Sequence, residues 1–485
     1  MKKKLSLLLV ASSVLYGHQH SDGETSHTFF AYRHWYGTDL PIYFSNTRYL
    51  SNLKEDGRGG ILQALVYGGQ TTNPKALARY FCPFNLDTLT VEENELEPGE
   101  YQVLGANLNI STVNGDFKST VKFRPKESVI GVSFNFKQEF GDKWWIEASF
   151  PIEHVTTNVR IEETIINDGG GLNVGGGGYF NNNNDGYATF TEAIQAPGLK
   201  YGRIDGAQST TGIADVEIRG GYKTINNKNF YWFSYLGILL PGGNKPKAVY
   251  MFEPIRGNGG HVVLTMGSDF GFPWIERSSF TLTVEGGING GYSFETRQTR
   301  SFDLNNKQWG RYLAITPQVS STTGNGVGNY GINNLTQEFK VSPRSYRCVT
   351  LGLLLDHLCG LQVEAGYQFF GRQREHIELA SGNWNDRIGL YDIVGGSANT
   401  ASSRTIDNNA NGQTDSTFIQ IQQNDLDFAS AVQPSTVTYV FYGSLAKTFD
   451  TNYPVLLGFG GEYEVGSSNE NMDRWTAWFK ADVMF

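Results

Sequence analysis

Charged side chains recur at every second position in many segments of this sequence, and their chemistry bears most directly on function. Alternate positions of an extended strand share one face, so each segment gathers its charges on one side. Such a face either lines a water-filled pore or pairs its charges within a filled interior. The candidate lumen residues are Glu139, Glu147, Glu153, Asp215, Glu217, Asp269, Glu285, Glu364, Glu462 and Asp482, with Arg219, Lys223, Arg372, Arg374 and Lys480. Their acid excess favours cations as the preferred ions.

Arg372 and Arg374 form the sharpest local feature, because one residue separates them at the end of a strand-like segment. Both guanidinium groups then project from the same side, where they could bind an anionic solute. Pairing with the neighbouring Glu375 or Glu378, or with carboxylates of the lumen, is the alternative, and the sequence leaves both interpretations open.

Motifs of the common enzyme classes are absent from the sequence. There is no G-x-S-x-G elbow, H-E-x-x-H zinc motif, P-loop or C-x-x-C pair. We therefore predict no enzymatic activity, no catalytic residue, no metal site and no cofactor. A serine and histidine brought together from distant strands stay open as an alternative, with His261, His357 and His376 as candidate bases.

The composition indicates a β-protein. Aromatic residues make up 13% of the chain and charged residues 18%, with Gly 58 and Pro 15, which suits many strands joined by glycine-rich turns. The net charge of −9 and the absence of a basic stripe argue against nucleic acid as a partner.

The N-terminus has the features of an export signal. Met1–Lys4 is basic, Leu5–Val10 is apolar and small residues follow, so we predict a signal peptide over residues 1–17. Residues 18–59 show no regular period and are expected to form a periplasmic or plug segment. No later run reaches the roughly 18–20 apolar residues of a spanning helix.

From Gly60 onward, about twelve alternating segments follow one another. Ser128–Phe140 and Lys143–Val155, joined by Gly141 and Asp142, are a clear hairpin. Short and long connections alternate along the chain, with long loops predicted at 72–127, 160–211, 295–343 and 380–435. Fourteen or sixteen strands result if Glu100–Ser111 or Gln308–Ile315 also cross.

The last segment, Arg474–Phe485, carries large apolar side chains on one face and polar ones on the other. With its terminal Phe485 it resembles the closing strand of Gram-negative, porin-like outer-membrane β-barrels. The resemblance implies an all-β fold in the bacterial outer membrane: a transmembrane antiparallel barrel over residues 60–485, with short periplasmic turns and long external loops. It also implies contact with membrane lipid, and insertion by the barrel-assembly machinery through Phe479, Val483 and Phe485. No particular family is identified.

Aromatic residues beside the predicted periplasmic turns support the same architecture. Trp144, Tyr231, Trp274 and Tyr453 are expected to form a girdle at the membrane–water boundary.

For function, the sequence favours a porin-like channel for passive diffusion of small hydrophilic solutes or ions. The main alternative is a closed barrel that acts as an adhesin or structural surface protein through its long loops. An outer-membrane hydrolase is the third hypothesis, and a homo-oligomer stays open.

Overall fold

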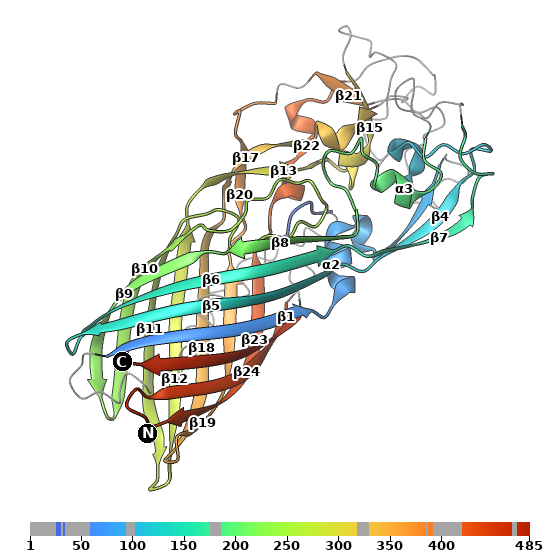
Figure 1. The fold of residues 1–485 in the computed structure, drawn as a ribbon. Coiled ribbons are helices and arrows are strands. Elements are labelled where there is room, and N and C mark those ends of the chain that lie inside the picture. The colour runs from blue at the N-terminus through green and yellow to red at the C-terminus, as the bar shows by residue number, and fades with distance from the viewer. Residues whose placement is uncertain are drawn as a thin grey trace, which may run out of the picture.

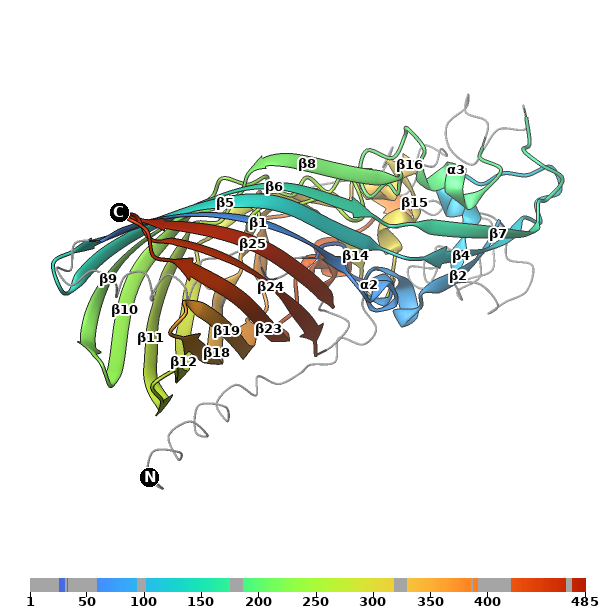
Figure 2. The ribbon, with the colours of Figure 1, turned by 60° about the horizontal axis from the view of Figure 1, so that its bottom comes forward.

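The computed structural model describes residues 26–30, 33, 59–93, 102–174, 186–317, 329–384, 387–390, 420–467 and 473–485. In these residues, twelve antiparallel strands close into a barrel, because β1 pairs with β5 on one side and with β25 on the other (Figures 1 and 2). The barrel strands are β1 (Gly60–Thr71), β5 (Lys126–Phe140), β6 (Trp144–Asn158), β9 (Val216–Asn227), β10 (Phe230–Leu240), β11 (Val263–Glu276), β12 (Phe280–Ser293), β18 (Arg344–His357), β19 (Leu361–Arg372), β23 (Thr436–Phe449), β24 (Val455–Gly466) and β25 (Arg474–Met484).

The two faces of the barrel wall differ in polarity. On β25, Trp475, Phe479 and Val483 are exposed on the outside, whereas Arg474 and Lys480 are buried on the inside. The outer faces of the other strands are likewise apolar, and closure leaves no unpaired edge for lipid to meet. The predicted transmembrane antiparallel barrel is confirmed, and the protein is a barrel of the bacterial outer membrane. No helix within the described ranges is long and apolar enough to cross a membrane.

The connections fall into two sets. At one end, five turns link neighbouring strands through residues 141–143, 228–229, 277–279, 358–360 and 450–454. At the other end, four of the six connections carry further elements in the described residues, and most of these elements fold over the barrel as a roof (Figure 1). Residues 102–111 and 308–315, which the sequence allowed as further crossings, belong to this roof.

The roof consists of short helices and four small sheets. Its helical elements are α2 (Pro74–Phe81), α3 (Phe190–Ile194), η2 (Pro83–Asn85), η3 (Gly105–Leu108), η4 (Gly310–Tyr312), η5 (Gly331–Asn333), η6 (Gln423–Asp425) and η7 (Phe428–Ala431). Its strands are β2 (Thr88–Glu92), β3 (Val103–Leu104), β4 (Lys118–Phe123), β7 (Ile161–Asn167), β13 (Thr296–Ser301), β14 (Asp303–Leu304), β15 (Ala314–Pro317), β16 (Asn329–Tyr330), β17 (Thr336–Ser342), β20 (His376–Leu379), β21 (Ile388–Leu390) and β22 (Leu426–Asp427). β8 (Ala207–Ile213) instead extends the barrel sheet by pairing with β6.

Two apolar clusters hold the roof together. Trp309, Phe81 and Phe123 belong to one cluster, and Phe302 and Phe339 belong to the other. The first cluster draws residues from four connections of the barrel and the second from two, so the roof folds as a packed layer in its own right.

Aromatic rings narrow the interior of the barrel. The ring of Trp145 lies where a side chain at Gly221 would stand, and the ring of Tyr442 covers Gly366 in the same way. These rings lie flat on glycines of a neighbouring strand, which fills the lumen with side chains.

Candidate functional site at the barrel mouth

A cavity of about 140 Å³ lies where the barrel opens toward the roof. Apolar side chains from the barrel wall, among them Leu239, Val263 and Phe370, form much of its surface. Phe29, Phe30 and Arg33 of the N-terminal segment line the same space. The charged residues that face it are Arg33, Glu153, Asp215, Glu217, Arg300, Arg372 and Glu375.

The N-terminal strap, defined here as Ser26–Phe30 with Arg33, is bonded into the roof. The backbone N–H of His27 donates to the carbonyl of Tyr80 (3.0 Å), and that of Thr28 donates to the carbonyl of Ser430 (2.9 Å). The hydroxyl of Tyr80 donates to the carbonyl of Phe29 (2.6 Å). Segments after β1 and before β23 therefore hold the strap from two sides.

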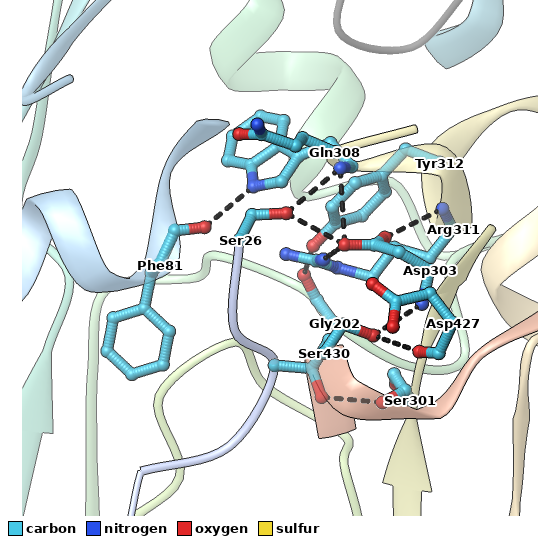
Figure 3. Close-up of polar contacts among 12 residues, drawn as sticks. Ser26, Phe81, Gly202, Ser301, Asp303, Gln308, Arg311, Tyr312, Asp427 and Ser430 are labelled. Atoms are coloured by element: carbon cyan, nitrogen blue, oxygen red, sulfur yellow. Dashed lines mark hydrogen bonds and ion pairs between the residues drawn. The ribbon is translucent and has the colours of Figure 1, made fainter. Parts of the chain in front are cut away.

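Ser26 ends the strap in a buried polar network (Figure 3). Its hydroxyl donates to Oδ2 of Asp303 (2.7 Å), which also pairs with the guanidinium of Arg311 (2.7 Å). The backbone N–H of Trp309 donates to the Ser26 hydroxyl (3.1 Å). Nearby, burial and the charge of Asp303 raise the pKa of Asp427 to about 6.

Arg33 anchors the other end of the strap inside the barrel. Its guanidinium lies 2.8 Å from Glu462 and 3.0 Å from Glu464, and its Nη1 donates to Gln368 (3.1 Å). Arg474 pairs with the same Glu464 (2.6 Å) and donates to the carbonyl of Arg33 (2.9 Å). Both carboxylates are buried, so this pairing offsets the cost of burying their charge.

Between the two anchors, Phe29 meets a buried arginine. The guanidinium carbon of Arg300 lies 3.0 Å from the centroid of the Phe29 ring, an arrangement that favours a cation over an aromatic face. Arg300 also pairs with Glu375 (3.5 Å). Burial lowers the pKa of Arg300 to about 10, which leaves it charged at neutral pH.

A local break in the barrel wall positions Asp215. Pro151 on β6 has no N–H to donate, and between β8 and β9 the chain bulges opposite it, with the N–H of Ala214 donating to the Pro151 carbonyl (2.9 Å). The carboxylate of Asp215 accepts the backbone N–H groups of Gly242 (3.2 Å) and Asn258 (2.7 Å). Asp215 thus ties the β10–β11 connection to the edge of the cavity.

Most of the candidate lumen residues lie on the inner face with a partner. Lys223 pairs with Glu139 (2.7 Å) and Arg219 with Glu217 (2.8 Å). Glu153, Glu285 and Glu364 accept hydrogen bonds from the hydroxyls of Tyr67, Tyr231 and Tyr442. Lys480, Asp482 and Glu462 are buried there too, while Glu147 and Asp269 are half-buried. In this conformation the charges fill the interior rather than face open water.

Two of the candidate residues lie elsewhere than the sequence pattern suggested. Arg372 lines the cavity, but Arg374 does not; its charge instead acts on His27 and Asp427 in the roof. Tyr231 points into the barrel toward Glu285, and its neighbour Trp232 is the aromatic residue that faces outward at this turn. Trp144, Trp274 and Tyr453 are exposed as expected of a girdle.

The three histidines considered as bases have other partners. His261 contacts the Phe294 carbonyl (2.9 Å) and Gln298, His357 contacts Cys359, and His376 contacts Glu378. None has a serine hydroxyl as a partner in the described part of the chain. No cluster of three or more possible metal ligands occurs among the described residues.

Sequence reasoning missed the strap residues. Ser26, Phe29 and Arg33 lie in a stretch without periodicity, so no local signal pointed to their partners, which stand hundreds of positions away. The only available sign was the concentration of aromatic residues in that stretch.

Comparisons with known proteins identify no family. No family model and no curated relative matches the chain. Among solved structures, an outer membrane channel from Pseudomonas putida F1 is 11% identical with a TM-score of 0.35, covering 89% of this chain and 99% of that one. The Pseudomonas putida toluene transporter TodX is 11% identical (TM-score 0.27, 96% of both chains). The translocator domain of the autotransporter NalP from Neisseria meningitidis is 9% identical (TM-score 0.29, 90% and 93%). Likenesses this distant do not identify a substrate.

Proposed function

We propose that this protein is a gated outer-membrane channel for small hydrophilic solutes, closed in the described conformation by its N-terminal strap. The observation that carries the proposal is Arg33, which lines the cavity at the barrel mouth and pairs with Glu462 and Glu464 on the inner wall. Removal of the strap would take Phe29, Phe30 and Arg33 away from the cavity at once.

The inner wall supports the solute class. Beyond the residues that line the cavity, the wall carries further buried acidic and basic side chains, among them Arg219, Lys480 and Asp482. A solute that passes through the lumen along this inner wall replaces contacts with water by contacts with polar side chains, which favours hydrophilic solutes. In the closed conformation the cavity volume is close to the roughly 150 Å³ that accommodates one benzene molecule.

Single-channel conductance of the refolded protein in a planar bilayer tests the gate. We expect the wild type to be mostly closed and Arg33→Ala to open far more often. Breaking a buried ion pair costs about 3–5 kcal/mol, and here that cost falls on the closed state. The open probability should rise by well over an order of magnitude.

Arg297→Ala is the matched control, because Arg297 pairs with Glu338 on the exposed surface of the roof. Surface pairs contribute about 0–1 kcal/mol, so this variant should behave as the wild type. A folded Arg33→Ala barrel that stays silent would show that the strap is not the gate.

A second candidate is a surface-binding protein, favoured by the folded roof. A roof with two apolar clusters of its own presents a defined surface to a neighbouring cell. Silence of both the wild type and Arg33→Ala in the bilayer would favour this function instead.

A further inference from the structure

A long groove of about 870 Å³ crosses the membrane-facing wall of the barrel, away from the cavity at the mouth. It runs over β9, β10, β11, β12 and β18, which are neighbours in the sheet. Its surface is almost entirely apolar, with Leu236, Leu264 and Met266 exposed along it.

Small residues form the floor of this groove. Gly220, Ser234, Ser268 and Gly290 lie on four successive strands, and a side chain added at Gly220 would meet nothing within 4 Å. The hydroxyls of Ser234 and Ser268 lie 3.2 Å apart, and Ser268 also donates to the Phe233 carbonyl (3.0 Å). The floor therefore has no hydroxyl that requires water.

The two ends of the groove differ. Trp144 and Tyr222 meet edge to face at the end near the turns, with ring centroids 4.8 Å apart. Arg347 stands at the roof end, three residues from the start of β18, and is paired across the sheet with Gly290. It is exposed, and no acidic side chain of the described residues lies within ion-pair distance.

A phosphate-bearing lipid fits both ends of the groove, because its phosphate suits Arg347 and its acyl chain suits the apolar part. A guanidinium on a lipid-facing wall is costly unless an anion accompanies it, and lipid phosphates lie at the depth of the strand ends. An acyl chain fills an apolar groove that faces the bilayer, and the rings at the far end suit its boundary.

We propose that this groove is a binding site for a phosphate-bearing lipid, with the phosphate on Arg347 and an acyl chain over Gly220 and Gly290. The site rests on the outer wall alone and does not depend on the proposed channel function. It would hold one lipid in a fixed position among the many that surround the barrel.

Native mass spectrometry of the delipidated protein with added phosphatidylglycerol tests the site. Arg347→Gln should weaken retention of the first lipid about fivefold, the effect of one basic residue near a lipid headgroup. Gly220→Leu places an apolar side chain on the floor, where its Cβ meets no atom within 4 Å, and should reduce retention of phosphatidylglycerol and phosphatidylcholine alike.

Two control variants carry the same changes elsewhere. Gly68→Leu alters the outer face of β1, where a side chain would meet only ordinary contacts, and Arg297→Gln removes a roof charge. Both should retain lipid as the wild type does, and the heat-dependent gel shift verifies folding of every variant. Equal retention in Arg347→Gln, Gly220→Leu and wild type would overturn the proposal. A dimer that Gly220→Leu dissociates would overturn it too, because a second copy would then occupy the groove.

Discussion

His27 is the strap residue whose charge state depends on mildly acidic pH. Its ring stacks on Tyr80 at 4.4 Å, and burial, together with the charges of Arg374 and Arg311, lowers its pKa to about 3. A docked strap therefore holds His27 neutral, whereas a released strap takes up a proton near pH 6.5. The contribution of neutral His27 to docking of the strap is therefore fully present above pH 6.5 and is lost as the pH falls toward 3.

We expect acidification to release the strap. The equilibrium constant for docking should fall roughly tenfold for each pH unit below 6.5. Asp427 acts in the opposite sense, because its raised pKa of about 6 makes the folded roof bind a proton between about pH 4 and 6. The experiment therefore compares open probability at pH 7 and pH 5 in an Asp427→Asn background. His27→Gln in that background should abolish the change, and an unaltered pH dependence would contradict the role of His27.

At the scale of elements, an aromatic ring on one barrel strand packs against a glycine on the neighbouring strand. Gly221 has no room for a side chain because the Trp145 ring covers it, whereas its neighbour Gly220 faces open space on the outside. Gly221→Ala should lower the free energy of unfolding by about 1–3 kcal/mol through overpacking. Gly220→Ala, the same change one residue away, should be neutral or stabilising. Urea unfolding in detergent measures both, and equal values would show that the Trp145 contact does not matter.

The closing strand β25 offers a second test at this scale. Phe485 exchanges backbone hydrogen bonds with Gly60 (2.9 and 3.0 Å), and its ring stacks on Phe136 with centroids 6.3 Å apart. Phe485→Ala keeps the backbone bonds and removes the ring. If the ring is an insertion signal, assembly in cells should fall severalfold while refolding in detergent proceeds normally. Parallel losses in both assays would assign the ring to barrel closure alone.

For the whole molecule, the roof and the barrel have separate sources of stability. Trp309 is fully buried in the roof, donates to the Phe81 carbonyl (2.8 Å) and packs edge-on against Phe123. Trp309→Ala should cost the roof about 3–5 kcal/mol and expose it to protease. The barrel should keep its heat-dependent gel shift, because its strands are closed without Trp309.

Trp274→Ala serves as the control for that prediction, because Trp274 is exposed on the outer wall of the barrel. Roof cleavage should then stay at the wild-type rate. Loss of the gel shift in Trp309→Ala would show instead that the barrel needs its roof to stay closed.

Much of the barrel was predictable from sequence alone. Alternation in segments such as Ser128–Phe140 predicted which side chains face lipid, and the strand count of about twelve was correct. A period of two is a local property of an extended chain, so the sequence of each strand shows which residues face the lumen and which face lipid. Closeness to a turn, the basis for placing Tyr231 in the girdle, carries no such information: its hydroxyl donates to Glu285 inside the barrel, because neighbouring residues of a strand face opposite sides.

The sequence by itself determined the wall of this protein: its strands, their polarity and the apolar closing strand. Tertiary structure alone decided what fills and covers that wall. Arg33 meets Glu464, and Ser26 meets Asp303, only because barrel closure brings residues hundreds of positions apart to one mouth. The two apolar clusters of the roof likewise join residues of different connections, so their contacts are not local in the sequence. Contacts of that kind depend on the shape of the closed barrel, which no local pattern records.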